Sequence, residues 1–165
     1  MTALVHLVTG QTGAGKTTYA QQLAEQQNGV RFSIDEWMTS LFWMDSPDGI
    51  TFSWAMTRIA RCEEMIRQQA QTFLRHNIAV VLDLGFTKRD QRIAFTGWAA
   101  RRAEETHLHW VDVPAEERWV RVRSRNIERG STYVMQVDRA MFDFMEDEWE
   151  APDADELAHR VAAFW

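Results

Sequence analysis

The sequence of 165 residues is poor in cysteine, proline and lysine, and it contains no long hydrophobic run. Its single cysteine, Cys62, excludes an internal disulfide and any zinc site built from several cysteines. No apolar stretch approaches the ~18 residues that a membrane-spanning helix needs. Residues 1–9 lack the basic segment and cleavage site of a signal peptide. We therefore expect a cytoplasmic protein whose cysteine is reduced and which has no membrane partner.

The remaining composition is that of a folded globular chain. Hydrophobic residues make up 45% of it and aromatic residues 12%, with 8 glycines and 3 prolines. Such values exclude a fibrous or wholly disordered protein. The length is typical of one domain, and no internal repeat is present. We therefore expect residues 1–165 to form a single domain. Nothing in the sequence indicates an oligomeric state.

The net charge of −6 argues at first against a nucleic-acid partner. The acidity is local, however, because residues 141–156 carry eight acidic side chains and no basic one. The rest of the chain has 18 basic against 16 acidic side chains. A nucleic-acid partner is therefore possible but not favoured.

Hydrophobic periodicity and turn residues predict an alternation of strands and helices. Strands are expected near residues 4–9, 30–34, 78–82 and 107–113, and helices near 17–27, 35–41, 55–73, 90–104, 114–126 and 137–149. This order predicts an α/β fold with a parallel sheet covered by helices on both faces.

A phosphate-binding loop follows the first predicted strand. Residues 10–17 match G-x-x-x-x-G-K-[ST] in full and lie between a strand and a helix, as the motif requires. Its backbone N–H groups and the helix N-terminus are suited to bind phosphates. Lys16 is expected to reach the β- and γ-phosphates, and the Thr17 hydroxyl to bind Mg²⁺. The predicted nucleotide site comprises Gly10, Gln11, Thr12, Gly13, Ala14, Gly15, Lys16, Thr17 and Thr18.

Two carboxylates follow predicted strands, where an open α/β sheet binds its ligands. Asp83 ends the most apolar strand and is the candidate for holding Mg²⁺ or its water; a turn or helix-capping role is the alternative. Asp35 follows Ser33-Ile34 and is the candidate general base for a substrate hydroxyl. Because Asp is also a preferred helix N-cap, the sequence leaves both roles of Asp35 open.

Arginines crowd into residues 118–129. Arg121 and Arg125 are four residues apart and share a helix face, where planar guanidinium groups can stack on a base or bind phosphate oxygens. Residues 126–136 could form a small lid that brings arginines onto the transferring phosphoryl group. A solvated basic face, neutralised by neighbouring glutamates, is the alternative.

Aromatic residues concentrate between the second strand and the long helix. Trp37, Phe42 and Trp54 could line an acceptor pocket, or could form a small satellite core. Arg89 and Arg92 could hold an anionic acceptor, although helix arginines are more often solvated. His107 and His109 alternate on one strand and point to one face, but no third metal ligand is evident.

These motifs together resemble the small P-loop kinases. The chain resembles the zeta-toxin, chloramphenicol phosphotransferase and polynucleotide 5′-kinase group, and more closely the bacterial AAA-type kinases. The resemblance is carried by the phosphate loop, by Ser33-Ile34-Asp35, by Val81-Leu82-Asp83-Leu84-Gly85, and by Asp112-Val113-Pro114 before an Arg-x-x-x-Arg helix. The resemblance covers residues 4–150 and implies a three-layer P-loop NTPase fold with a mainly parallel, nucleoside-kinase-like sheet and a small helical lid. It also implies that Asp35 is the base, that Arg121 packs on adenine and that Arg125 contacts phosphates. Residues 36–60 match no single member of the group, so the resemblance does not indicate which acceptor this protein uses.

The function expected from the sequence is transfer of the ATP γ-phosphoryl group to a hydroxyl of a small molecule, with Mg²⁺. ATP is favoured over GTP because Thr87-Lys88-Arg89-Asp90, which looks like a guanine-reading motif, follows Asp83 too closely. The first alternative is a polynucleotide or nucleotide 5′-kinase. The second is a nucleotide-binding regulator or slow ATPase without an acceptor.

Overall fold

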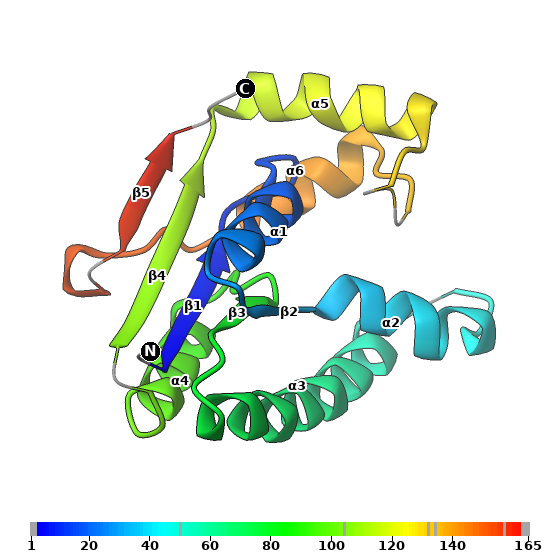
Figure 1. Ribbon diagram of the computed structural model, residues 1–165. Coiled ribbons are helices and arrows are strands. Elements are labelled where there is room, and N and C mark those ends of the chain that lie inside the picture. The colour runs from blue at the N-terminus through cyan, green and yellow to red at the C-terminus, as the bar shows by residue number, and fades with distance from the viewer. Residues whose placement is uncertain are drawn as a thin grey trace.

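A single parallel sheet organises the molecule in the computed structural model, which describes residues 3–49, 51–103, 105–131, 133, 135–156 and 158–162. The strands are β1 (Leu4–Thr9), β2 (Val30–Ser33), β3 (Val80–Asp83), β4 (Glu105–Asp112) and β5 (His159–Ala162). Their order is β2-β3-β1-β4-β5, and every neighbouring pair is parallel (Figure 1). The predicted parallel α/β sheet is confirmed; β5, at one edge, was not predicted.

All six predicted helices are present, with ends that differ from the prediction by a few residues. They are α1 (Lys16–Gln26), α2 (Ile34–Phe42), α3 (Phe52–Arg75), α4 (Arg89–Ala99), α5 (Ala115–Glu128) and α6 (Arg139–Asp147), with short 3-10 turns at η1 (Trp43–Asp45) and η2 (Ala154–Glu156). The largest difference is in α4, which was expected to reach residue 104. It ends at Ala99, where a tight turn begins and leads the chain into β4. Among the described residues, no helix is both long and apolar enough to cross a membrane.

Helices cover both faces of the sheet (Figure 1). On one face, α3 and α4 pack on a core that includes Val5, Leu7 and Leu82. The apolar stripe predicted for the long helix is buried there, at Cys62, Ile66, Ala70 and Leu74. On the other face, α1 packs against residues whose side chains alternate with these along the strands, among them Val8 and Val81. Successive side chains of a strand point to opposite faces of the sheet, so the same strands contribute apolar side chains to the core on each face.

A smaller apolar cluster joins α5 to α6. Val122 of α5, Phe142 of α6 and Val137 from the segment between these helices are buried together. The Asn126 side chain donates to the Val137 carbonyl at 2.7 Å and accepts from its N–H at 3.1 Å. Residues 126–136, for which a lid is predicted, therefore begin in the last turn of α5, and Asn126 binds Val137 just beyond them. A lid function of this segment stays a prediction, and residues 132 and 134 lie outside the described part of the chain.

The register of the parallel strands positions the site. Leu7 pairs with Leu82, and Ser33 pairs with Asp83. Because the strands are parallel, β1, β2 and β3 end at the same edge of the sheet, the edge at which open α/β folds bind ligands. The phosphate loop leaves β1 there, and α2 begins there directly after β2.

Candidate active site

The phosphate loop between β1 and α1 needs glycine for conformation and for space. Gly13 and Gly15 have φ angles of 80° and 92°, a region that glycine enters without strain. A Cβ on Gly13 would lie 2.7 Å from the Arg118 carbonyl oxygen and 2.8 Å from a Val122 methyl group. The loop is therefore packed directly against α5, and its backbone path depends on these glycines.

The N-terminus of α1 is suited to an anion. A helix leaves its first N–H groups without intrahelical acceptors, and most helices satisfy them with a side-chain cap or an acidic first turn. Among the six α-helices in the described part of the chain, α1 alone has neither. The N-cap of α1 is Gly15, which has no side chain to offer. A phosphate group would complete this helix end.

Lys16 starts α1 and lies among charged groups. Its ammonium group donates to the Gln11 carbonyl oxygen at 3.1 Å. Burial lowers the pKa of Lys16, whereas the nearby Asp83 and Asp35 carboxylates act in the opposite direction. The cation thus sits in a poorly hydrated place between two carboxylates, where its attraction to a phosphate would be strong.

Asp83 ends β3, as predicted, and is buried at 5% exposure. Burial raises its pKa, while Lys16 and Arg31 oppose that shift. Arg31, on the neighbouring strand β2, donates to Asp83 at 3.1 Å and also pairs with Glu36 in the first turn of α2. Arg31 was not predicted as a residue of the site because its partner is 52 residues away. In a half-buried strand, its side chain alone is no sign of an ion pair.

Asp35 is not the cap of α2. The structure assigns that role to Ser33, whose hydroxyl accepts from the Glu36 N–H at 3.4 Å. Asp35 is exposed in the first turn of the helix. Its carboxylate is close enough to act on the pKa of Lys16, Asp83 and Arg125. The capping alternative is therefore wrong, and Asp35 faces the charged groups at the sheet edge.

The two arginines of α5 approach the same place. Arg121 donates to the Ala14 carbonyl oxygen of the phosphate loop at 3.4 Å and pairs with Glu117. Burial lowers the pKa of Arg125, while Asp35 and Tyr133 act to raise it. The buried Arg125 Nε has no hydrogen-bond partner within the described residues. Arg125 therefore lies between α2 and the segment after α5, with a donor left for a ligand.

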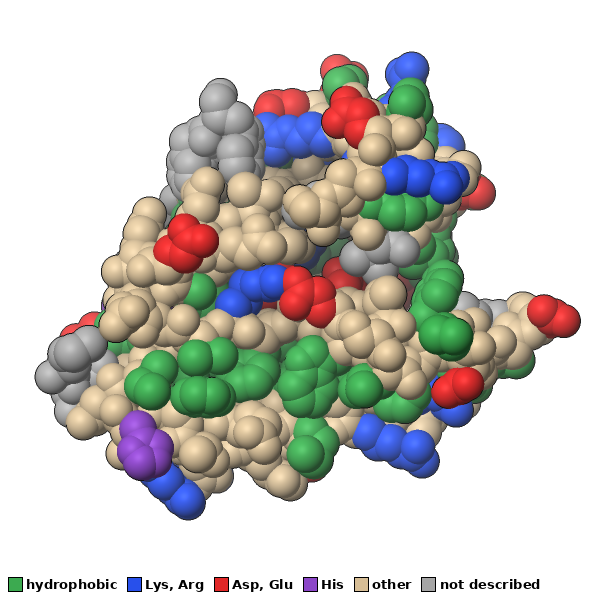
Figure 2. Space-filling model, turned by 45° about the vertical axis from the view of Figure 1, so that its right-hand side comes forward, with side chains coloured by type: hydrophobic (Ala, Val, Ile, Leu, Met, Phe, Trp, Pro, Cys, Tyr) green, Lys and Arg blue, Asp and Glu red, His purple; other side chains and the backbone are tan. Residues whose placement is uncertain are grey.

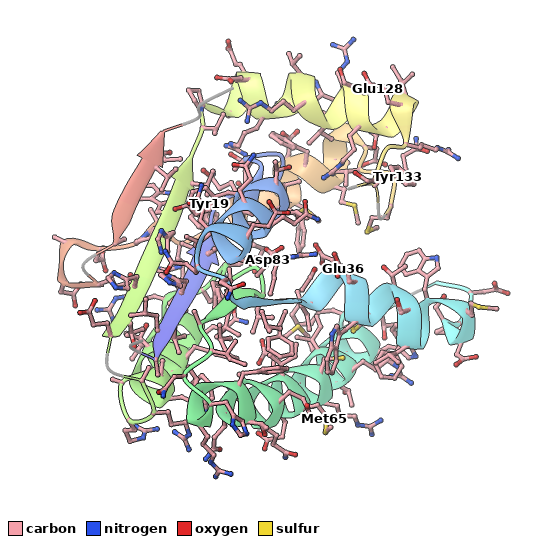
Figure 3. The ribbon with its side chains drawn as sticks, viewed as in Figure 1. Tyr19, Glu36, Met65, Asp83, Glu128 and Tyr133 are labelled. Carbon is pink, nitrogen blue, oxygen red and sulfur yellow. The ribbon has the colours of Figure 1, made fainter. Side chains whose placement is uncertain are left out.

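The surface is hollowed between these elements. Figure 2 shows a hollow between the upper and lower parts of the molecule, with acidic and basic side chains together in it. In Figure 3, Asp83 lies near the start of α2, Glu36 lies on its first turn, and Tyr133 lies across from them on the segment after α5. The charged cluster of Lys16, Asp35, Asp83 and Arg125 is thus formed by the phosphate loop, α2, β3 and α5.

The predicted Mg²⁺ ligands, Thr17 and Asp83, carry oxygen donors of the kind that this cation prefers. Within the described residues, no group of three or more His, Cys, Asp or Glu side chains is arranged to hold a metal ion by itself. Mg²⁺ at nucleotide sites takes most of its shell from phosphate oxygens and water. The donor set therefore fits Mg²⁺ that arrives with a nucleotide.

Two predicted acceptor residues have other partners. Arg92 is fully buried, pairs with both carboxylate oxygens of Glu156 at 2.7 and 2.9 Å, and donates to the carbonyl oxygens of Phe86 and Glu150. Arg89 pairs with Asp153 at 3.0 Å and Asp155 at 2.7 Å. Both arginines bind the acidic C-terminal segment. Arg92 is buried there, so its prediction as an acceptor contact is wrong, whereas an acceptor contact of Arg89 stays a prediction.

The guanine-like sequence 87–90 is engaged in the same way. Lys88 pairs with Glu148 and Glu150, and the Thr87 carbonyl oxygen accepts from the Glu150 N–H at 3.1 Å. Together with the Arg89 pairs, these contacts tie the segment to residues 148–155 rather than to a base site. This placement agrees with the prediction that residues 87–90 do not bind guanine.

Arg118 is also buried, at 2% exposure, and is not part of a solvated basic face. Its guanidinium pairs with Glu146 of α6 and donates to the carbonyl oxygens of Val113 and Thr12. The sequence did not single out Arg118 among the arginines of residues 118–129, because its acidic partner is 28 residues away.

The aromatic residues of the predicted acceptor pocket belong in part to the core. Trp37 and Phe42 pack against the apolar cluster under α2, and the Trp37 ring meets Phe32 edge-on at 6.3 Å. The half-buried Trp54 lies 4.0 Å beneath the Arg58 guanidinium. The satellite core that was the alternative is thus present for Trp37 and Phe42. Contact of these residues with an acceptor stays a prediction.

His107 and His109 do share a face of β4, and a third histidine joins them from β1. His6 stacks on His107 with ring centroids 5.3 Å apart and shares a 3.0 Å hydrogen bond with His109. His109 in turn meets the Tyr19 hydroxyl of α1 at 2.7 Å. The sequence could not show His6 beside them because β1 and β4 are far apart in the chain.

Comparison with known proteins supports the kinase-like fold. A search of curated proteins found no match. A protein from Chloroflexus aurantiacus described as a candidate kinase has a TM-score of 0.72 at 17% identity, covering 98% of this chain and 88% of the other. A gluconokinase from Sinorhizobium meliloti has a TM-score of 0.64 at 15% identity, with 98% and 82% covered.

A chain of the Pnkp1/Rnl/Hen1 RNA repair complex has a TM-score of 0.68 at 17% identity over 89% of this chain; the present chain spans only 44% of its length. At such identities the likeness shows the fold. The family model for the AAA domain matches residues 5–152. The chain therefore belongs to the AAA domain family and has the fold of the small P-loop kinases that its motifs resemble.

Proposed function

We propose that the protein is an ATP-dependent phosphotransferase that moves the γ-phosphoryl group to a hydroxyl of a small molecule. The observation that carries this proposal is the convergence of Lys16, Asp35, Asp83 and Arg125 from four elements at one edge of the sheet. Phosphoryl transfer depends mainly on positioning and charge neutralisation. Two cations beside an uncapped helix N-terminus supply both, and two carboxylates face them.

Each group has a role in this scheme. The phosphate loop, Lys16 and the first turn of α1 hold the triphosphate, and Arg121 packs on the adenine. Mg²⁺, held by Thr17 and Asp83, would neutralise charge on the phosphate oxygens. Arg125 binds the transferring group through donors that include its Nε, which has no hydrogen-bond partner among the described residues. Asp35 accepts the proton of the acceptor hydroxyl.

The bond changes balance. The acceptor oxygen forms a bond to the γ-phosphorus, and the bond from that phosphorus to the β,γ-bridging oxygen breaks. Its electron pair stays on the bridging oxygen, which leaves as part of ADP. The hydroxyl proton passes to the Asp35 carboxylate. Because Asp35 is exposed, it can exchange that proton with solvent before the next cycle.

The test uses labelled ATP, a metabolite extract and paired variants. Asp35→Asn keeps the size of the side chain and removes the base, so we expect turnover to fall about 10²- to 10⁴-fold. ATP affinity, measured by calorimetry, should change less than about threefold, since Asp35 does not hold the nucleotide. Lys16→Ala should weaken ATP binding at least about tenfold, because a charge-assisted contact is lost.

Asp90→Asn is the matched control, because Asp90 is also an exposed aspartate in the first turn of a helix. It should leave turnover and ATP affinity unchanged. Equal losses of turnover and ATP affinity in Asp35→Asn would contradict the base assignment. ATP binding without any labelled product would favour a nucleotide-binding regulator or slow ATPase instead.

A polynucleotide 5′-kinase is the second candidate, favoured by the likeness to a chain of the Pnkp1/Rnl/Hen1 RNA repair complex. The same assay distinguishes it when an oligonucleotide with a 5′-hydroxyl end replaces the extract. Labelling of that end, abolished by Asp35→Asn, would support this candidate. Labelling of small molecules alone would support the first.

A further inference from the structure

The two side chains that follow Gly10 in the phosphate loop both reach α6. The Gln11 amide donates to Glu146 at 3.0 Å, and the Thr12 hydroxyl donates to the Met145 sulfur at 2.9 Å. These contacts span more than 130 residues of sequence. Figure 1 shows α6, in orange, beside the start of α1. Side chains of α6 therefore contact the phosphate loop directly, although no motif in the sequence links the two segments.

Glu146 is the centre of this contact. Besides the Gln11 amide, its carboxylate accepts from both terminal nitrogens of Arg118, at 2.5 and 2.7 Å. Arg118 uses its other donors on backbone, at 2.7 Å to the Val113 carbonyl oxygen and 3.2 Å to that of Thr12. One carboxylate thus ties α6 to the loop through Gln11 and, through Arg118, to the loop backbone and the start of α5.

The electrostatics indicate that this carboxylate serves the loop. A negative charge beside an anion-binding loop weakens phosphate binding unless a cation neutralises it. Here the two-pronged pair with the buried Arg118 provides that neutralisation, so the carboxylate can hold the loop without repelling the ligand. Arg118 itself lies on the Thr12 side of the loop, and each of its three guanidinium nitrogens donates to an acceptor of the protein.

Gln11 also links this network to Lys16. Its carbonyl oxygen accepts from the Lys16 ammonium group, while its side chain holds Glu146. A nucleotide phosphate would compete for Lys16 and so alter the environment of Gln11. On its other side, α6 follows directly from the segment after α5, and Asp138 caps its first turn.

We propose that Glu146 is a positioning residue for the phosphate loop, acting through Gln11 and Arg118. It holds the loop in the shape that receives phosphate, and it passes nucleotide binding on to α6. This inference rests on the proposed nucleotide binding. It predicts that occupancy of the loop stabilises α6, although α6 supplies no group to the nucleotide.

The test is hydrogen exchange of the backbone amides in residues 10–20 and 139–147, with and without a non-hydrolysable ATP analogue. In the wild type, the analogue should slow exchange in both segments. Gln11→Ala leaves the buried Arg118–Glu146 pair intact, so the variant should fold. At saturating analogue, it should show slowed exchange in the loop but clearly less slowing in α6 than the wild type, because only the route through Arg118 remains.

Kinetics supply a second measurement. Loss of a hydrogen bond to a charged group that positions the loop should raise the KM for ATP in Gln11→Ala about five- to tenfold. The turnover number should fall by a smaller factor than the KM rises, because the Gln11 side chain supplies no group to the reaction itself. Asp143→Asn is the control, since Asp143 is an exposed carboxylate on α6 that pairs with Arg139 instead. It should behave as the wild type in both measurements.

Two results would overturn the inference. Slowing of exchange in α6 that is as strong in Gln11→Ala as in the wild type would exclude a role of Gln11 in this coupling. So would a wild type in which the analogue binds and leaves α6 unchanged, while the proposed function would stand. If the analogue does not bind at all, the proposed function fails and this inference fails with it.

Discussion

Gly13 shows how little room single residues of the phosphate loop have. Its φ is 80°, and a Cβ at this position would approach the Arg118 carbonyl oxygen to 2.7 Å, so any side chain is unfavourable. We predict that Gly13→Ala lowers the free energy of unfolding by about 1–3 kcal/mol through backbone strain and the clash. It should also weaken ATP binding, since the loop must shift away from α5. Urea unfolding and calorimetry measure the two effects.

Gly97, in the interior of α4, is the matched control for this substitution. It has no positive φ, and a Cβ there would meet only the end of the Arg101 side chain, at 3.9 Å. Gly97→Ala should therefore stabilise the protein by up to about 1 kcal/mol, because alanine favours a helix. If both substitutions have the same effect, the space and φ at Gly13 are not what requires glycine there.

At the residue scale, the sequence predicted what depends on neighbours in the chain. The eight-residue phosphate loop carries its own geometry, so the motif located it. Asp83 was located because a strand end is visible in the sequence. The sequence did not predict the contacts of Arg31, Arg92 and Arg118. Each of these side chains binds a carboxylate or carbonyl oxygen of a residue 28 to 106 positions away in the chain. A lone arginine on a helix or strand is otherwise most often solvated.

At the scale of elements, the contact between β1, β4 and α1 contains the buried imidazole of His6. Burial, with a smaller effect of His107, lowers the pKa of His6 to about 4. In the unfolded chain His6 has its ordinary pKa of about 6.5. Between these values the unfolded chain binds a proton that the folded protein excludes. Stability therefore falls as pH drops from about 6.5 to about 4.

We predict that His6 accounts for about 3 kcal/mol of stability lost over this range. Urea unfolding at several pH values between 7 and 4 measures it, with His6→Asn beside the wild type. The variant should lose about that much less stability on acidification. His76→Asn, at an exposed histidine, should keep the pH profile of the wild type. A His6→Asn profile parallel to that of the wild type would contradict the prediction.

The helices and the strands β1 to β4 could be predicted because each has a recognisable apolar pattern. The strand β5 has four residues, two of them polar, and lies at the edge of the sheet. Its two polar residues are adjacent, so it lacks the polar-apolar alternation that indicated β2, a strand of the same length. The order of the strands in the sheet could not be predicted either, because the pattern of one segment does not show which strand lies beside it. The contacts of His6 with His107 and His109 depend on that order.

At the scale of the whole molecule, the Arg92–Glu156 pair joins α4 to the C-terminal segment. Arg92 is fully buried, and the Glu156 side chain is 6% exposed. Removing one partner of a buried pair leaves the other charge without compensation. We predict that Arg92→Ala lowers the free energy of unfolding by about 3–5 kcal/mol. Arg92→Lys should recover little of it, since an ammonium cannot replace the planar set of donors.

Denaturant unfolding of the purified variants measures this loss. Arg123→Ala, at an exposed arginine of α5, should stay within about 0.5 kcal/mol of the wild type. An Arg92→Ala variant as stable as Arg123→Ala would mean that the C-terminal segment is not held by this contact. The acidic stretch 141–156 would then be a charged surface, as its composition alone suggests.

The Arg92 contact also bears on the order in which the protein matures during synthesis. A ribosome adds residues at about 5–20 per second, so α4 emerges several seconds before its partner Glu156, 64 residues later in the chain. Until then the Arg92 guanidinium has no carboxylate and cannot be buried at low cost. The layer of α4 on the sheet therefore stays loosely packed in the nascent chain. Its final packing depends on a segment that is translated only after all the strands and helices of the nucleotide site.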